Sequence, residues 1–169
     1  GYGLANMEWM IPAAPDTKFR IASISKQFTA MAILRLHEDN LLDVQDSICL
    51  YLEECPETWQ NISINHLVTH TSGIPDYAGQ IDIRLLNQPS FSRRYVLDIF
   101  RDLPLHFSPG EDWEYSNSGY FLLALIIEAA SGQSYERFLQ DTFFEPLHMT
   151  NTGVDHPGGV IGNRAEGYS

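Results

Sequence analysis

The sequence predicts an α/β (α+β) fold that is mainly helical, with one short strand at the N-terminus. Apolar residues recur at helical spacing from Ser23 to Glu38, and an almost wholly apolar run follows Ser118. By contrast, residues 1–9 show the alternating pattern of a strand. No internal repeat, low-complexity tract or interdomain linker interrupts the 169 residues, so we expect one domain over residues 1–169.

The N-terminal strand is expected within Gly1–Trp9, where Tyr2, Leu4, Asn6 and Glu8 share one parity. Pro12 and Pro15 then indicate a loop. A single strand leaves its edges unpaired.

The first helix is predicted over Ser23–Glu38, with a stop signal at Asp39. A helix after Ser118 is apolar nearly all round and should lie in the core, and Gly132 ends it. Serines before apolar runs act as N-caps, and Ser63 and Ser134 fit this role. Further helices are predicted at Asp46–Leu52, Ser63–Thr69, Ser92–Asp102 and Tyr135–Phe144. The segment His70–Ser90 is rich in Gly, Pro, Asp and Asn and is predicted to be a long surface loop.

The charge balance excludes several partners. The chain carries 22 acidic and 10 basic residues, a formal net charge of -12. Binding to nucleic acid or an anionic membrane requires clustered positive charge, so neither partner is expected. No apolar stretch approaches the roughly 18 residues of a membrane span, so we expect none in this segment.

Two cysteines, Cys49 and Cys55, lie six positions apart. They can form a disulfide only if a turn brings them close, and free thiols are the expected state. Their spacing suits neither a zinc site nor a redox pair, and it does not decide the compartment.

Ser23 and Lys26 stand three residues apart at the start of the first helix, so both side chains lie on one face. A serine hydroxyl becomes a strong nucleophile when a base takes its proton, and a lysine can serve as that base. Lys26 is one of only two lysines in the chain. Taken alone, the pair also fits an N-cap serine and a solvated lysine.

Tyr115 and Asn117 are the second candidate pair, in a loop before the buried helix. A tyrosine can accept a proton if a nearby ammonium stabilises its phenolate, and an asparagine amide can bind a substrate amide. Taken alone, they also fit a packed aromatic residue and a helix cap.

Five blocks of sequence together resemble the serine β-lactamase and penicillin-binding protein superfamily. The tyrosine in Tyr115-Ser116-Asn117 resembles the class C β-lactamases and their esterase and peptidase relatives, where class A enzymes have Ser-Asp-Asn. The blocks follow the order of that family: Phe19–Lys26, Leu67–Ile74, Pro109–Gly110, Trp113–Tyr120 and Pro146–Thr152.

The resemblance implies a role for each candidate. Ser23 would be the acylated nucleophile, Lys26 its proton partner, Tyr115 the general base, and Asn117 a contact for substrate and lysine. The backbone N–H of Ser23 would form half of an oxyanion hole. The implied reaction is acyl transfer from an amide or ester to water, without a metal or organic cofactor.

The family's third motif, Lys-Thr-Gly or His-x-Gly on a later strand, is missing from these residues. The resemblance therefore implies a partial domain: an internal fragment holding mainly the helical region and one strand, with most of the antiparallel sheet elsewhere. The implied substrate is a small molecule or peptide, such as a β-lactam, a D-amino-acid peptide or an ester. A carboxypeptidase or esterase is favoured by analogy, as is an extracytoplasmic location, and the oligomeric state stays open.

Three alternatives remain to be compared with the structure. A Ser-His-Asp hydrolase with a Gly-x-Ser-x-Gly elbow is not supported, because no serine has glycines two residues to each side. His66 and His70 have the i, i+4 spacing of metal ligands, but the residue after His66 is Leu67 rather than glutamate. We expect both histidines to be structural, with His70 holding the turn at residues 71–73. The third alternative is a non-catalytic binding or scaffold relative of the same fold, or an inactive fragment; retention of all four candidates argues against the non-catalytic relative.

Overall fold

A computed structural model describes residues 1–80, 92–156 and 158–168. The part of the predicted loop that falls on residues 81–91 lies outside the described residues. Within the described ranges, no helix combines the length and the apolar character needed to cross a bilayer.

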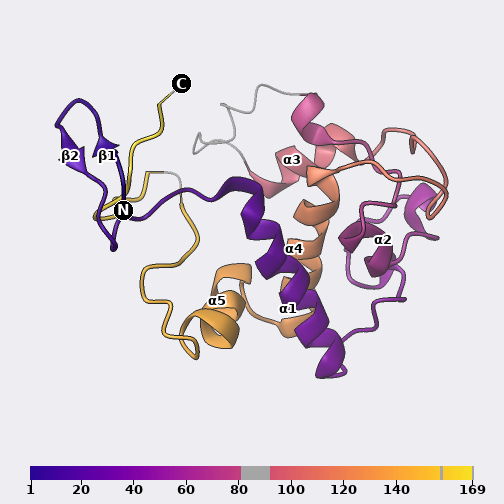
Figure 1. The fold of residues 1–169 in the computed structure, drawn as a ribbon. Helices are drawn as coiled ribbons and strands as arrows, with labels where there is room; N and C mark the ends of the chain where they lie inside the picture. The colour runs from indigo at the N-terminus through magenta and orange to yellow at the C-terminus, as the bar shows by residue number, and fades with distance from the viewer. Residues whose placement is uncertain (81–91, 157, 169) are drawn as a thin grey trace.

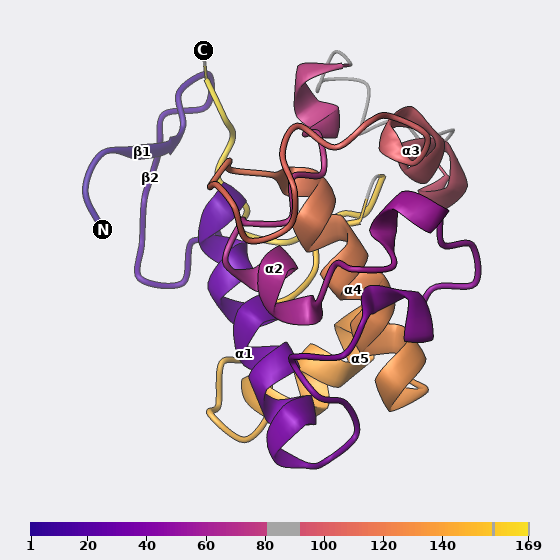
Figure 2. The ribbon, with the colours of Figure 1, turned by 90° about the vertical axis from the view of Figure 1, so that its right-hand side faces the viewer.

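A body of packed helices forms most of the molecule (Figures 1 and 2). Helix α4 (Asn117–Ser131) contacts α1 (Lys26–Glu38), α2 (Ile64–Val68) and α5 (Tyr135–Leu139). Four of its apolar side chains have no exposed surface: Leu122, Leu123, Ile126 and Ile127. Burial of these apolar side chains is the main favourable contribution to packing, and the predicted core position of this helix is confirmed.

Serine side chains cap four of the helices, as the sequence predicts for Ser63 and Ser134. Each of these serines accepts a hydrogen bond from a backbone N–H in the first turn of its helix. The pairs are Ser63 with α2, Ser92 with α3 (Arg93–Phe100), Ser116 with α4 and Ser134 with α5. Gly132 closes α4 in the left-handed conformation, at φ 68°.

Three of the predicted helices differ in detail from the helices of the structure. The helix expected over Asp46–Leu52 is a single 3₁₀ turn, η2 (Ile48–Leu50), capped by Ser47. The helix expected over Tyr135–Phe144 changes after α5 into a wider π-helical turn, η6 (Gln140–Phe144). The first helix begins with a 3₁₀ turn, η1 (Ala22–Ser25), before α1. Two more 3₁₀ turns, η3 (Glu57–Trp59) and η4 (Tyr77–Gly79), lie in the loops.

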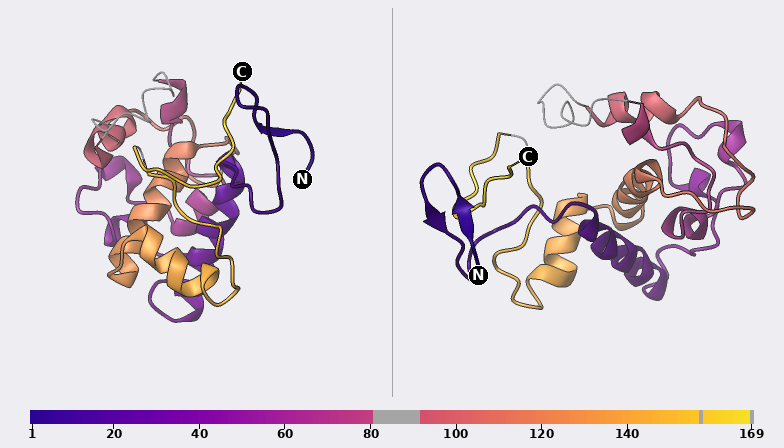
Figure 3. Two further views of the ribbon diagram at one scale, coloured as in Figure 1. Left: turned by 90° about the vertical axis from the view of Figure 1, so that its left-hand side faces the viewer. Right: turned by 45° about the horizontal axis from the view of Figure 1, so that its top comes forward.

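The N-terminal strand is paired, which corrects the expectation of a lone strand followed by a loop. Strand β1 (Leu4–Asn6) forms an antiparallel hairpin with β2 (Ile11–Pro12). The Asn6 side chain makes the reversal possible, because its Oδ1 accepts the Trp9 backbone N–H at 2.7 Å. The C-terminal segment runs beside this hairpin (Figure 3), where the Glu166 N–H donates to the Ala5 carbonyl at 2.8 Å.

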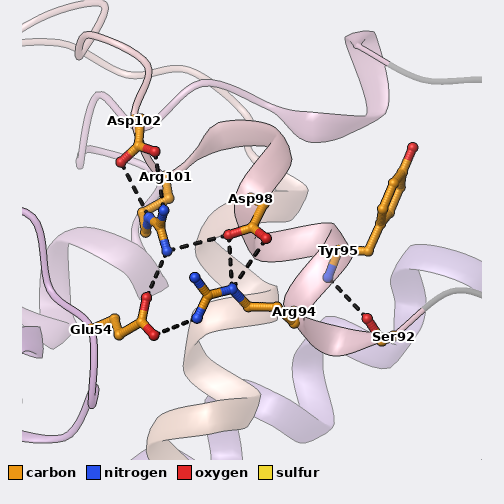
Figure 4. Close-up of polar contacts among 7 residues, drawn as sticks. All are labelled: Glu54, Ser92, Arg94, Tyr95, Asp98, Arg101 and Asp102. Atoms are coloured by element: carbon orange, nitrogen blue, oxygen red, sulfur yellow. Dashed lines mark hydrogen bonds and ion pairs between the residues drawn. The ribbon is translucent and has the colours of Figure 1, made fainter.

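The cysteines form a disulfide, Cys49–Cys55, so the expectation of free thiols was wrong. The turn after η2 brings the two Cα atoms to 5.3 Å, within the range a disulfide spans. Glu54, inside this small loop, pairs with Arg94 and Arg101 of the α3 region (Figure 4). These ion pairs connect the disulfide loop to the α3 region.

Candidate active site

Ser23 lies in the 3₁₀ turn η1, immediately before α1, and its side chain is exposed. The preceding residue, Ala22, has φ 45°, a left-handed conformation that is uncommon for a residue other than glycine. Strained backbone of this kind is often found at functional sites. Three residues further on, Lys26 turns its amine back, and Nζ donates to Ser23 Oγ at 3.3 Å.

Tyr115 approaches the same serine from the loop before α4. Its hydroxyl oxygen lies 2.6 Å from Ser23 Oγ, and either hydroxyl can be the donor. Lys26 Nζ lies over the ring of Tyr115, 4.7 Å from its centroid. The ammonium group is therefore close enough to favour negative charge on the phenol.

Asn117, the first residue of α4, completes the group of residues expected from the sequence. Its Oδ1 accepts a hydrogen bond from Lys26 Nζ at 2.7 Å. The structure thus brings Ser23, Lys26, Tyr115 and Asn117 into one hydrogen-bonded group.

Sequence reasoning missed Asp76, which precedes η4. Its Oδ2 accepts from Asn117 Nδ2 at 2.9 Å, and its Oδ1 accepts from the Asn117 backbone N–H at 3.1 Å. Asp76 extends the group to a third part of the chain. In the sequence, Asp76 cannot be distinguished from an ordinary aspartate in a turn. The nearest indication of a functional role was the Leu67–Ile74 block, which ends two positions before it.

His70 contacts the loop that carries Tyr115, rather than holding the turn at residues 71–73 with its side chain as expected. Its Nδ1 accepts the Ser116 backbone N–H at 3.2 Å. Its ring packs against those of Tyr115 and Tyr120, with centroid distances of 4.7 and 5.0 Å. The imidazole therefore packs directly against the ring of Tyr115.

The turn at Thr71–Gly73 holds the same loop through its backbone. The Thr71 and Gly73 carbonyls accept from the N–H groups of Gly110 and His106, each at 2.8 Å. A Cβ added at Gly73 would lie 2.1 Å from the Phe107 carbonyl oxygen, so only glycine allows this approach.

The other histidine of the i, i+4 pair has a local role. His66 forms a capping box with Ser63, whose backbone N–H donates to His66 Nδ1 at 3.2 Å. Among the described residues, no group of three His, Cys, Asp or Glu side chains could hold a metal ion.

Burial and nearby charges shift the pKa values of Tyr115 and His70. Burial by itself would raise the pKa of Tyr115, but its hydrogen bonds with Lys26 and Ser23 and the charge of Lys26 outweigh burial, and the net pKa is lower than usual. For His70, burial and the charge of Lys26 lower the pKa, against the opposing effect of Asp76. His70 thus favours its neutral form, in which Nδ1 can accept.

Comparison with known proteins decides the family. The family model described as "Beta-lactamase" matches residues 1–169, the whole chain. The chain belongs to the beta-lactamase family. The superfamily resemblance and the partial α/β fold are therefore confirmed.

Relatives in this family have hydrolytic and penicillin-binding descriptions. Penicillin-binding protein 4* of Bacillus subtilis is 38% identical over 155 residues, covering 90% of this chain and 34% of the relative. A penicillin-binding protein from Bacillus halodurans has a TM-score of 0.88 at 32% identity, over 99% of this chain and 51% of that structure. The D-amino acid amidase from Ochrobactrum anthropi SV3, complexed with L-phenylalanine amide, has a TM-score of 0.78 at 28% identity, over 88% of this chain and 41% of that structure.

The chain thus spans about a third of the length of the first curated relatives that it matches. These relatives support a serine hydrolase type of function in general.

Proposed function

We propose that the protein containing this chain is a serine hydrolase that forms an acyl-enzyme on Ser23 with an amide or ester substrate. The observation that carries the proposal is the contact of Ser23 Oγ with both Tyr115 Oη, at 2.6 Å, and Lys26 Nζ, at 3.3 Å. A nucleophile within hydrogen-bond reach of a base, itself held by a third group, is the arrangement that covalent catalysis requires.

In the acylation step, Ser23 Oγ attacks the carbonyl carbon while its proton passes to the phenolate oxygen of Tyr115. Lys26 stabilises that phenolate, which agrees with the lowered pKa of Tyr115. Collapse of the tetrahedral intermediate breaks the C–N or C–O bond, and the leaving group takes the proton from Tyr115.

In the deacylation step, Tyr115 takes a proton from water, and the resulting hydroxide attacks the ester carbonyl. The acid product leaves as the proton returns to Ser23. Asn117 would contact the substrate amide, while its Oδ1 holds Lys26 at 2.7 Å.

The substrate class that we propose is an amide or ester of a D-amino acid or a short peptide. The D-amino acid amidase and the penicillin-binding proteins among the relatives support this class by analogy. A carboxypeptidase, amidase or esterase is favoured over a dedicated β-lactamase.

The test is intact-protein mass spectrometry after incubation with a fluorophosphonate and, separately, with a penicillin. We would compare residues 1–169, the complete protein that contains them, and a Ser23→Ala variant of each. One adduct of the expected mass, lost in the variant, supports the proposal. A complete protein that forms no adduct and hydrolyses no amide or ester would instead indicate a non-catalytic binding relative.

A further inference from the structure

We propose that Asp76 is a positioning residue of this site, which fixes the orientation of the Asn117 amide so that its oxygen faces Lys26. The inference rests on the proposed function, and it assigns to Asp76 a role in the same reaction. Asp76 belongs to the loop before η4, and its hydrogen bonds go to Asn117 and Ala78 rather than to Ser23.

The polarity of the hydrogen bonds determines which end of the Asn117 amide faces Asp76. An ionised carboxylate only accepts hydrogen bonds, whereas an asparagine amide has one accepting and one donating end. Asp76 Oδ2 lies 2.9 Å from Asn117 Nδ2, so it holds the donating end of the amide. The accepting end, Oδ1, is thereby left for Lys26 Nζ at 2.7 Å.

The position of the carboxylate is itself well defined. Asp76 Oδ1 accepts the backbone N–H groups of Asn117 and Ala78, at 3.1 and 3.2 Å. On either side of Asp76, the Ser118 hydroxyl donates to the Pro75 carbonyl at 2.7 Å and accepts the Tyr77 N–H at 2.9 Å. Ser118 has no exposed surface, so the loop is fastened to the start of α4 by buried bonds.

The orientation matters for the lysine. With the amide as observed, Lys26 Nζ has acceptors on two sides, Asn117 Oδ1 and Ser23 Oγ. With the amide reversed, an NH₂ group would face the ammonium, and two donors would oppose each other. Lys26 would then move away from Ser23 and from the ring of Tyr115.

Asp76→Asn in the complete protein tests whether Asp76 orients the Asn117 amide. Asparagine keeps the shape and one accepting oxygen for the two backbone N–H groups, but it presents an NH₂ group to Asn117 and favours the reversed amide. We expect the rate of Ser23 labelling by the fluorophosphonate to fall about 10- to 100-fold, as small misplacements of reacting groups do. We expect Tm to change little.

The matched control is Asp46→Asn. Asp46 is also half-buried, and it accepts the Asp43 backbone N–H at 2.9 Å and the Tyr51 hydroxyl at 2.6 Å, but it takes no part in the hydrogen-bonded group around Ser23. This variant should label at the wild-type rate. Equal labelling of Asp76→Asn and the wild type would overturn the inference while leaving the proposed function intact.

Side-chain amide NMR gives a readout independent of catalysis. The Asn117 Nδ2 protons, assigned by their loss in Asn117→Ala, should include one shifted downfield by the carboxylate, and it should move upfield in Asp76→Asn. An unchanged resonance would overturn the inference. If the wild-type protein does not label at all, the proposed function fails, and the NMR result still decides whether Asp76 orients the amide.

Discussion

The hydroxyl oxygens of Tyr115 and Ser23 lie 2.6 Å apart, although 92 positions separate the two residues in the chain. Two loops bring them together: the turn η1 before α1, and the loop that leads into α4. The close packing of α1 on α4 therefore holds the two hydroxyl groups within hydrogen-bond distance.

Replacing the tyrosine tests that relationship directly. Tyr115→Phe keeps the ring but removes the hydroxyl that the proposed mechanism uses as proton acceptor, so we expect the rate of Ser23 acylation to fall about 10²- to 10⁴-fold. The side chain is 38% exposed, so the free energy of unfolding should change by only about 0.5 kcal/mol. Labelling kinetics and chemical denaturation measure the two effects.

Tyr2→Phe is the control, because Tyr2 is fully exposed, and it should behave as the wild type. Wild-type acylation by Tyr115→Phe would assign the base to Lys26 alone.

Gly73 controls the position of the Tyr115 loop. At φ +75°, a Cβ on residue 73 would lie 2.1 Å from the Phe107 carbonyl oxygen, so Gly73→Ala forces the two loops apart. We expect a loss of about 2 kcal/mol or more in the free energy of unfolding, together with slower labelling of Ser23. Urea denaturation measures the first effect.

Gly79→Ala in the same part of the chain is the matched control, because nothing lies within 4 Å of its added Cβ. It should be neutral or slightly stabilising. Equal stability of the two variants would contradict the proposed close approach at Gly73.

His66 and His70 should make stability depend on pH. Each ring accepts a backbone N–H at Nδ1, from Ser63 and from Ser116, and burial lowers the pKa of both below the ordinary value of 6.5. Because the folded-state pKa is lowered, the unfolded chain binds protons first as the pH falls. The stabilisation is therefore present above pH 6.5 and is lost as the pH falls through the lower folded-state values.

The paired variant His66→Asn/His70→Asn isolates this effect. An asparagine Oδ1 can accept the same N–H but does not titrate between pH 7 and pH 5, so Tm should fall less over that range than in the wild type. Parallel Tm profiles would show that the two histidines do not account for the acid sensitivity.

The sequence predicted the local features well because their causes are local. Ser63, Ser134 and Gly132 act on the backbone within a few residues, and they cap helices as expected. The four candidate site residues were recognisable because the motifs occur together in family order. Asp76 was not recognisable from the sequence, because its partner Asn117 lies 41 positions away and only the tertiary fold brings the two residues together.

The loop expected after the first strand and the free thiols expected at Cys49 and Cys55 were wrong because both depend on the path of a turn. Pro12 lacks a backbone donor and suggested a loop, yet an edge strand tolerates proline, and the Asn6 turn returns the chain at the right place. The pairing of Cys49 with Cys55 depends on the path of the turn between them, which periodicity does not reveal.

That disulfide should contribute measurably to stability. It closes a loop between residues six positions apart, and the chain-entropy model gives about 2 kcal/mol for a loop of this size. We expect Cys49→Ser/Cys55→Ser to lower the free energy of unfolding by about that amount in guanidinium denaturation, and to loosen the contacts of Glu54 with Arg94 and Arg101. Dithiothreitol should destabilise the wild type toward the value of the variant and leave the variant unchanged. A wild type with the same stability in its oxidised and reduced forms would mean that the remaining contacts of the loop hold it without the bond.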